Sequence, residues 1–165
     1  MASHAAESPA DPGPHPWFIV ANASRARAFR RRIGNTGYDA VREWDSPDAR
    51  TSSAALGEDR PGRLFAAAGA TQRSGIDPED ADATPKGQAQ RDFLHQLADD
   101  LTAAIRGGAV SALFLAAPAP VLHRLRDLLP QELRPAIRGE HAADITQHPT
   151  ADVFHRLDAL RRGEA

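Results

Sequence analysis

The sequence WFIVANASRARAFRRRIG, residues 17–34, decides the fold of the N-terminal half. Its first five residues form a continuous apolar run, which is typical of a strand buried on both faces. The next three, Asn22-Ala23-Ser24, favour a turn. Residues 27–33 can then pair back on the first strand, so the stretch predicts a β-hairpin.

A second turn signal follows this hairpin directly. Gly34-Asn35-Thr36-Gly37 combines two glycines with an asparagine, a composition typical of turns. Residues 38–44 have the composition of a third strand, which can pair with the second. The N-terminal half is therefore predicted to be a three-stranded antiparallel meander.

Helices and strands alternate in the C-terminal half. Thr84-Pro85 is a favourable helix start, with threonine as N-cap and proline at the first helical position. Apolar residues then recur every four positions until Gly107-Gly108 ends the helix. The further predicted elements are a buried strand at 110–116, a helix opened by Pro118 and Pro120 and broken by Pro130, a short strand at 136–142, and a last helix capped by Thr150.

The predicted order of elements is β-β-β-α-β-α-β-α. Antiparallel strands followed by βαβ units give a mixed sheet with helices on its faces, because parallel strands need a crossover connection between them. We therefore expect an α/β fold with a mixed five-stranded sheet, ribonuclease-H-like in its strand order, and with a long loop after the third strand.

Two segments lack a regular pattern. Residues 1–16 are small, polar and proline-rich, and we expect a disordered tail because they cannot bury apolar surface. Residues 45–84 show neither a helical nor a strand period, and a loop of this length is usually either functional or disordered. The sequence leaves both readings of the loop open. Residues 17–165 are long enough for one domain.

Composition excludes several classes of protein. The chain contains no cysteine, which excludes disulfides, thiolate metal sites and cysteine nucleophiles. Its longest apolar run, residues 112–121, is too short to span a membrane, and the N-terminus lacks the pattern of a secretory signal. We therefore expect a cytoplasmic protein that does not insert into membranes.

Three segments resemble a bacterial family, the proteins required for attachment to host cells. They are WFIVANASRARAFR at 17–30, DRPGRLF at 59–65, and the long segment 113–149 that begins LFLAAPAPVLHRLRDLLP. Together they span nearly everything from residue 17 onward. The resemblance implies a role in attachment, through binding to a protein or to the cell envelope.

The same family resembles, more remotely, the central domain of the class-one peptide-chain release factors of archaea and eukaryotes. In those factors a long loop after the third strand carries a Gly-Gly-Gln tripeptide that enters the peptidyl-transferase centre. Here the Gly-Gln pair, Gly87-Gln88, follows Lys86 and falls in the first turn of a predicted helix. The resemblance is therefore compatible with binding to RNA or the ribosome without peptide release.

Catalytic patterns are absent from the sequence. A two-metal nuclease needs several carboxylates near the strand ends, whereas the first strand ends at the neutral amide of Asn22, and the acids Asp92, Asp99 and Asp100 fit the solvated face of a helix. No serine lies in a Gly-x-Ser-x-Gly pattern and no phosphate-binding glycine loop occurs. We expect a non-enzymatic protein without a cofactor.

Histidines do not form a metal motif either. His141, Asp144 and His148 are close in sequence, but they lack the i, i+4 spacing of a helical zinc site. We interpret them as ordinary surface residues and predict no metal. The tryptophans Trp17 and Trp44 have apolar neighbours and are predicted to lie in the core.

Arginines form the remaining candidate site. One group is expected on the turn after the first strand, and a second flanks a Pro-Gly turn in the long loop. Guanidinium groups pair bidentately with phosphate or carboxylate, so the two groups together could hold RNA phosphates or an acidic ligand. The candidate binding residues are Asn22, Ser24, Arg25, Arg27, Asp59, Arg60 and Arg63.

Three interpretations of the function follow. The leading one is a non-enzymatic domain that associates with RNA or the ribosome through these arginines. The second is a protein-binding factor that influences attachment to host cells, and the third is a hydrolase that uses the long loop. Against the leading interpretation, the arginines could simply pair with Asp45, Asp48, Glu58 and Asp59 and anchor the loop.

Overall fold

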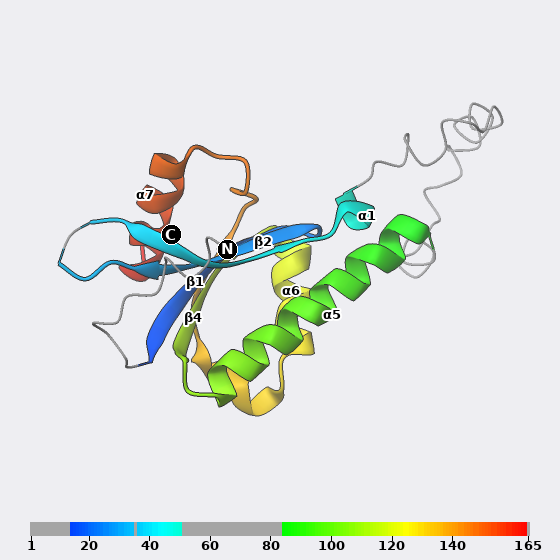
Figure 1. Ribbon diagram of the computed structural model, residues 1–165, viewed down its shortest axis with the longest axis horizontal. Coiled ribbons are helices and arrows are strands. Elements are labelled where there is room, and N and C mark those ends of the chain that lie inside the picture. Colours follow the sequence, from blue (N-terminus) through cyan, green and yellow to red (C-terminus); the bar gives the residue numbers. More distant parts are fainter. Residues whose placement is uncertain (1–13, 35, 51–83, 165) are drawn as a thin grey trace.

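The centre of the protein is a five-stranded sheet of order β3-β2-β1-β4-β5, seen in a computed structural model that describes residues 14–34, 36–50 and 84–164 (Figure 1). β1 pairs antiparallel with β2, and β2 with β3, whereas the β1–β4 and β4–β5 pairs are parallel. The predicted mixed five-stranded sheet is therefore confirmed; its ribonuclease-H-like character stays a prediction. The strands are β1 (His15–Ala21), β2 (Arg25–Arg31), β3 (Tyr38–Asp45), β4 (Val110–Ala117) and β5 (Ile137–Ala142).

Helices cover both faces of this sheet. α5 and α6 lie on one face and α7 lies on the other (Figure 1). A short helix, α1, follows β3, and a 3-10 helix precedes β5. The bounds are α1 (Pro47–Arg50), α5 (Pro85–Arg106), α6 (Ala119–Leu128), η3 (Gln131–Ala136) and α7 (Thr150–Arg161).

The antiparallel meander is slightly longer than the sequence predicts. β1 begins at His15, which pairs with Val110 of β4, so the two residues before Trp17 belong to the sheet rather than to a tail. β2 begins at Arg25, which pairs with Asp45 at the end of β3. The sequence predicted that this strand starts at residue 27, which is too late. Charged arginines at its start hide the apolar pattern by which a strand is usually recognised.

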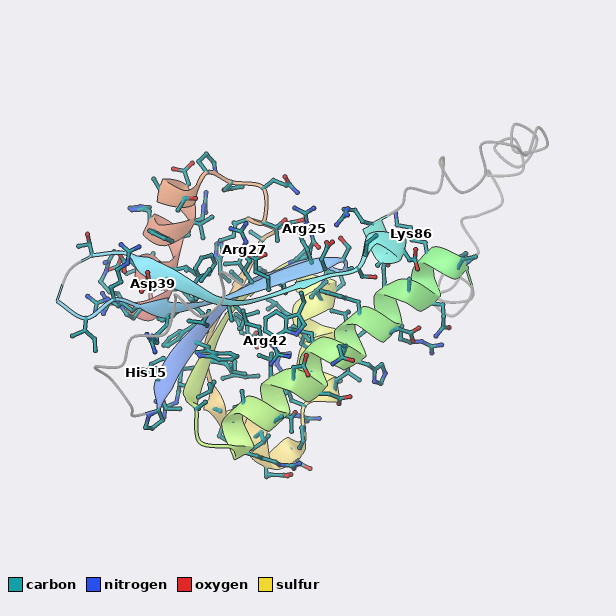
Figure 2. The ribbon with its side chains drawn as sticks, viewed as in Figure 1. His15, Arg25, Arg27, Asp39, Arg42 and Lys86 are labelled. Carbon is teal, nitrogen blue, oxygen red and sulfur yellow. The ribbon has the colours of Figure 1, made fainter. Side chains whose placement is uncertain are left out.

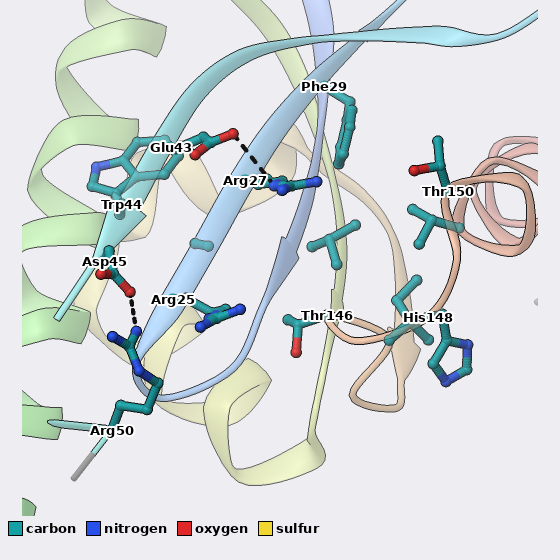
Figure 3. Close-up of a pocket in the computed structure, with 14 residues that line it drawn as sticks. Arg25, Arg27, Phe29, Glu43, Trp44, Asp45, Arg50, Thr146, His148 and Thr150 are labelled. Carbon is teal, nitrogen blue, oxygen red and sulfur yellow. Dashed lines mark hydrogen bonds and ion pairs between the residues drawn. The ribbon is translucent and has the colours of Figure 1, made fainter. Parts of the chain in front are cut away.

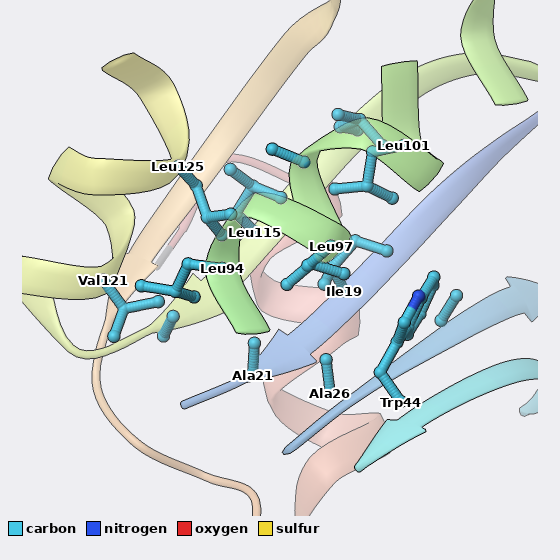
Figure 4. Close-up of a cluster of buried hydrophobic side chains, with 14 of the residues drawn as sticks. Ile19, Ala21, Ala26, Trp44, Leu94, Leu97, Leu101, Leu115, Val121 and Leu125 are labelled. Atoms are coloured by element: carbon cyan, nitrogen blue, oxygen red, sulfur yellow. The ribbon is translucent and has the colours of Figure 1, made fainter. Parts of the chain in front are cut away.

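The larger core lies between the sheet and the two helices α5 and α6 (Figure 4). The apolar stripe predicted for the long helix is confirmed, since Leu97 and Leu101 are fully buried there. They pack with Ile19 of β1 and Leu115 of β4. Trp44 of β3 is also buried on this face, as predicted.

The ends of α5 follow the sequence signals. The Thr84 hydroxyl accepts a hydrogen bond from the Gly87 amide at 2.9 Å, which caps the helix. Gly107 caps the other end, and Gly108 adopts a φ of 86° that favours glycine. The predicted start and end of this helix are thus confirmed.

The smaller core lies under α7 and is rich in aromatic rings. Phe18 of β1 stacks on Phe114 of β4 with ring centres 4.7 Å apart, and it meets the ring of Tyr38 edge-on at 5.0 Å. Leu157 of α7 is fully buried against them. These contacts hold α7 against the sheet.

Three predicted details are wrong. Thr150 does not cap α7, because the cap position is occupied by Pro149 and no side chain makes a capping hydrogen bond there. The segment after β3 starts with a helical turn, α1, whose Ala49 is buried and whose Ala49 carbonyl accepts a 3.5 Å hydrogen bond from Gln90 of α5. Asp100 does not lie on a purely solvated helix face, since it accepts a hydrogen bond from the buried Trp44.

Among the helices of the described ranges, none combines the length and apolar composition that crossing a membrane requires.

Candidate functional site

The turn between β1 and β2 is organised by Asn22. Its side-chain oxygen accepts three hydrogen bonds, from the Ser24 amide at 2.9 Å, the Ser24 hydroxyl at 3.2 Å and the Arg25 amide at 3.0 Å. The main-chain N–H of Asn22 also donates to the Arg25 carbonyl. Asparagine favours such turns because its short side chain can replace main-chain partners. The result is a fixed position for Arg25 at the start of β2.

Asn22 also connects this turn to the loop between β5 and α7. Its side-chain nitrogen donates to Asp144 at 3.2 Å and to the Thr146 hydroxyl at 3.0 Å. Thr146 in turn donates its hydroxyl proton and its main-chain N–H to Asp144. Two segments that are far apart in sequence are thereby held together at one end of the sheet.

Hydrogen bonds in this network lower the pKa of Asp144. Burial by itself acts to raise that pKa, but the hydrogen bonds from Thr146 and Asn22, together with the charge of His148, outweigh it. The Asp144 carboxylate therefore stays ionised and keeps accepting these bonds at neutral pH. Its role is to hold the loop.

A cavity of about 310 Å³ opens beside this network (Figure 3). It lies on the α7 side of the sheet, where β1 and β5 end and β2 begins, and the β5–α7 loop forms its opposite wall. Ligand sites in open α/β sheets commonly lie just outside the carboxyl ends of the parallel strands. The position and size of the cavity both suit a small-molecule or single-group site.

Three arginines line the cavity, and they differ in their partners. Arg27 pairs with Glu43 on β3 at 3.4 Å, and both side chains are more than half exposed. Arg50 of α1 pairs with Asp45. Within the described ranges, no carboxylate lies within ion-pair distance of Arg25. The Arg25 guanidinium points into the cavity toward Thr146 (Figure 3).

The alternation of side chains along β2 explains this arrangement. Ala26 and Ala28 face α5 and are buried in the larger core. Arg25, Arg27 and Phe29 face the other side of the sheet, because neighbouring residues of a strand point to opposite faces. Figure 2 shows both arginines on that side of the sheet, with Arg42 on the side of α5.

Apolar residues form the inner part of the cavity. Val20 of β1, Phe29 of β2 and Val153 of α7 line it and are themselves almost fully buried. Phe29 is fixed by an edge-on contact with the ring of Phe154 at 6.0 Å. The cavity therefore combines an apolar wall with a cationic mouth.

Four of the predicted binding residues are brought together by the structure. As expected, they lie at the turn and at the start of β2: Asn22, Ser24, Arg25 and Arg27. The Asn22 side chain, however, forms its hydrogen bonds with other residues of the protein. That this group binds a ligand stays a prediction. The three from the long loop, Asp59, Arg60 and Arg63, lie outside the described residues.

The expectation of internal pairing is met only in part. Arg27 does pair with an acid, but its partner is Glu43 rather than one of the four acids expected. Asp45 pairs with Arg50 of α1, an arginine outside the predicted group. The Arg27–Glu43 pair forms because β2 and β3 lie in register, whereas Arg50 reaches Asp45 from α1.

Sequence reasoning missed the opposite wall of the cavity. Thr146, His148 and Thr150 line it, and the side chains of His148 and Thr150 make no hydrogen bond within the part of the chain that the structure describes. The sequence does contain a signal for this wall. The segments that follow the parallel strands all leave the sheet at the same edge, the edge of the strands' carboxyl ends. Applied to β5, that rule places residues 143–149 close to Asn22.

Histidines and acids of the described ranges do not assemble into a metal site. Across residues 14–34, 36–50 and 84–164, no group of three or more histidine, aspartate or glutamate side chains is arranged to hold a metal ion. Asp144 is engaged with Asn22 and Thr146 instead. The ring nitrogen Nε2 of His141 is buried without a hydrogen-bond partner in the same part of the chain.

Comparison with known protein families assigns the chain to one of them. The model of one family, described as protein required for attachment to host cells, matches residues 17–157. The chain belongs to this family. The match spans the whole sheet from Trp17 onward and includes most of α7, so all the described walls of the cavity lie within the host-attachment domain.

Comparison with solved structures shows a remote likeness. An archaeal translation termination factor superposes on this host-attachment protein with a TM-score of 0.42 and 10% sequence identity, over 90% of this chain and 39% of the factor. The chain thus spans well under half of the factor's length, and the likeness is too distant to transfer an activity or the role of a residue. A search among curated proteins finds no match.

Proposed function

We propose that this host-attachment protein is a non-enzymatic interaction domain that binds RNA, free or within the ribosome, by its phosphate groups. One observation carries the proposal: the Arg25 guanidinium points into a cavity and has no acidic partner in the described ranges. Guanidinium groups pair bidentately with phosphate oxygens. Arg25 is therefore placed to receive a phosphate without breaking an ion pair to any described residue.

Local charge supports an anionic ligand. The whole chain carries a formal net charge of −2, whereas the described residues that line the cavity include three arginines and two acids, Glu43 and Asp45. Each of those acids is already paired with an arginine. The remaining positive charge sits on Arg25, so attraction of RNA would be local to this end of the sheet.

The arrangement of acids supports binding rather than catalysis. General acid–base pairs need carboxylates that can exchange a proton with a substrate. The two carboxylates on the cavity instead accept from guanidinium groups, as is typical of a surface that positions charge. A hydrolase centred on the long loop would use residues that the structure does not describe.

Co-sedimentation with ribosomes tests the proposal. We expect the full-length protein to co-sediment at low salt and to be released as salt rises, because phosphate contacts displace counterions. Arg25→Ala should weaken co-sedimentation by about 10-fold or more, since hydrogen bonds to charged groups contribute about 1.5–3 kcal/mol.

Arg31→Ala is the matched control. Arg31 lies at the other end of the same strand, is exposed, and does not line the cavity. It should bind as the unaltered protein does. Failure of the unaltered protein to co-sediment even at low salt, or equal losses in both variants, would contradict the proposal.

The family description favours a second candidate function. Proteins of this family are described as required for attachment to host cells, so the chain could instead act in attachment by binding a protein or the cell envelope. Attachment assays that compare the Arg25→Ala strain with a deletion strain separate the two ideas. Loss of attachment only on deletion would show that attachment does not use the arginine site.

A further inference from the structure

We infer that the cavity accepts a single nucleotide unit, with its phosphate on Arg25 and its ring against the apolar wall. The inference rests on the proposed function, which already places a phosphate on Arg25. It adds that the rest of the bound group is a nucleoside. The observation behind it is that one cavity holds both a cationic mouth and an apolar interior.

The apolar wall distinguishes this site from a simple phosphate patch. Val20, Phe29 and Val153 line the cavity beyond the arginines, and their side chains are almost fully buried, so they form a fixed surface. Little of this surface meets water in the protein alone, so the gain comes mainly from the ligand. A planar ring placed against the wall removes its own apolar surface from water, which stabilises the complex, whereas a ligand that carries only phosphate has no such surface to bury.

Spacing along β2 matches a ligand with a charged and an apolar end. Arg25, Arg27 and Phe29 occupy alternate positions on one face of the strand, so successive side chains are about 6.6 Å apart along it. A phosphate held by Arg25 therefore leaves the rest of the same nucleotide directed along the strand toward Phe29. The cavity volume of about 310 Å³ accommodates one such unit rather than several.

The two acids on the cavity favour a ligand that also carries hydrogen-bond donors. Glu43 lies opposite Arg27 on the neighbouring strand, pairs with it, and is more than half exposed, so its carboxylate can accept a further hydrogen bond at the mouth. Ribose hydroxyls and ring amino groups can donate to a carboxylate. The Thr150 hydroxyl and the His148 imidazole line the opposite wall, make no hydrogen bond to any described residue, and offer further partners.

Calorimetric titration of the full-length protein at low salt tests this inference. The probes are the four common ribonucleoside monophosphates, the matching nucleosides without phosphate, and inorganic phosphate. We expect at least one nucleotide to bind about 10-fold more tightly than both its nucleoside and inorganic phosphate, because only the nucleotide uses both ends of the cavity.

Variants of Arg25 locate the phosphate. Arg25→Ala should weaken nucleotide binding by about 10- to 100-fold. Arg25→Lys should lose less, since lysine keeps the charge but lacks the bidentate fork. Arg31→Ala should leave binding unchanged. Thermal unfolding of each variant confirms that the change acts on binding rather than on folding.

A competition experiment separates this inference from the proposed function. Its readout is displacement of a labelled single-stranded oligoribonucleotide by the mononucleotide that binds best. Displacement that depends on Arg25 supports both ideas. Nucleotide binding without any binding of RNA would keep the inference, with free nucleotide as the ligand, and overturn the proposed function.

Other outcomes overturn the inference. If RNA binds through Arg25 while mononucleotides bind no better than inorganic phosphate, the apolar wall contributes nothing and only the proposed function survives. If nucleotides bind equally well to Arg25→Ala, the nucleotide does not occupy this cavity. If neither RNA nor mononucleotide binds, both ideas fail together.

Discussion

Asn22 shows how one side chain can build a site without belonging to its binding surface. It makes five side-chain hydrogen bonds, three through its oxygen and two through its nitrogen. These use all the donors and acceptors that a carboxamide offers. Asn22 therefore sets the distance between the arginine turn and the β5–α7 loop, and so sets the width of the cavity.

Replacing Asn22 should cost stability as well as shape. Asn22→Ala leaves the partly buried partners of these bonds unsatisfied, so we expect the free energy of unfolding to fall by about 1–3 kcal/mol. Urea denaturation measures the change. Ser24→Ala removes only one of the bonds and is the control. Equal effects of the two variants would show that the bridge to Asp144 and Thr146 contributes nothing.

At the scale of elements, α7 is tied to the sheet through Tyr38, the only tyrosine of the chain. Its hydroxyl donates to Asp158 of α7 at 2.7 Å. Burial raises the pKa of Tyr38 well above its usual value, and the hydrogen bond and negative charge of Asp158 raise it further. A group with a raised pKa stabilises the fold fully below its unfolded pKa, which for tyrosine is about 10, and loses that contribution as pH rises further.

The phenolate absorbance of Tyr38 should therefore not appear at pH values near 10 while the protein is folded. Asp158→Asn should lower the pKa of Tyr38, because it removes the negative charge beside the hydroxyl. Asp152→Asn, on the same helix and exposed, should leave the titration unchanged. A folded protein that titrates like free tyrosine would contradict this account of the α7 contact.

The other face has a corresponding tie between β3 and α5. Asp100 accepts hydrogen bonds from Trp44 at 2.7 Å, from Arg42 at 3.0 Å and from Gln96 at 3.0 Å. Burial acts to raise the pKa of Asp100, but the hydrogen bonds and the charge of Arg42 outweigh it and hold that pKa below its usual value. A lowered pKa stabilises the fold above the unfolded value of about 3.9 and ceases to do so as pH falls through the folded value.

Asp100→Asn should accordingly destabilise the protein at neutral pH by about 1.5–3 kcal/mol, the usual contribution of hydrogen bonds to a charged group. The difference from the unaltered protein should shrink as pH falls below about 4. Urea denaturation across this pH range measures it. Asp99→Asn, on the neighbouring exposed position, should show neither effect, and a pH-independent difference would argue against the ionised form of Asp100 as the tie.

At the scale of the whole molecule, unequal coverage of the sheet creates the site. α5 and α6 together cover one face. On the other face α7 packs on the aromatic cluster around Phe18 and Tyr38, and the start of β2 stays open beside it. Side chains that point to this open region need not be apolar, and β2 places Arg25 and Arg27 there.

Much of the fold was predictable because its signals are local. Apolar runs, turn residues and helix caps act over a few neighbouring residues, and they predicted the strands of the sheet, the start of α5 at Pro85 and its end before Gly107. Two local details were predicted wrongly. Charged arginines made the start of β2 look like part of the turn, and Pro149, not Thr150, occupies the N-cap position of α7.

The sequence by itself determined the order of the elements, the two buried faces and the family, since each depends on residues that are close along the chain or on their succession. Only the tertiary structure decided the cavity. Its walls come from a turn and a loop that Asn22 and Thr146 join across 124 positions of sequence. Which arginine lacks an acidic partner among the described residues likewise depends on strand register and on α1, and no short stretch of sequence encodes either.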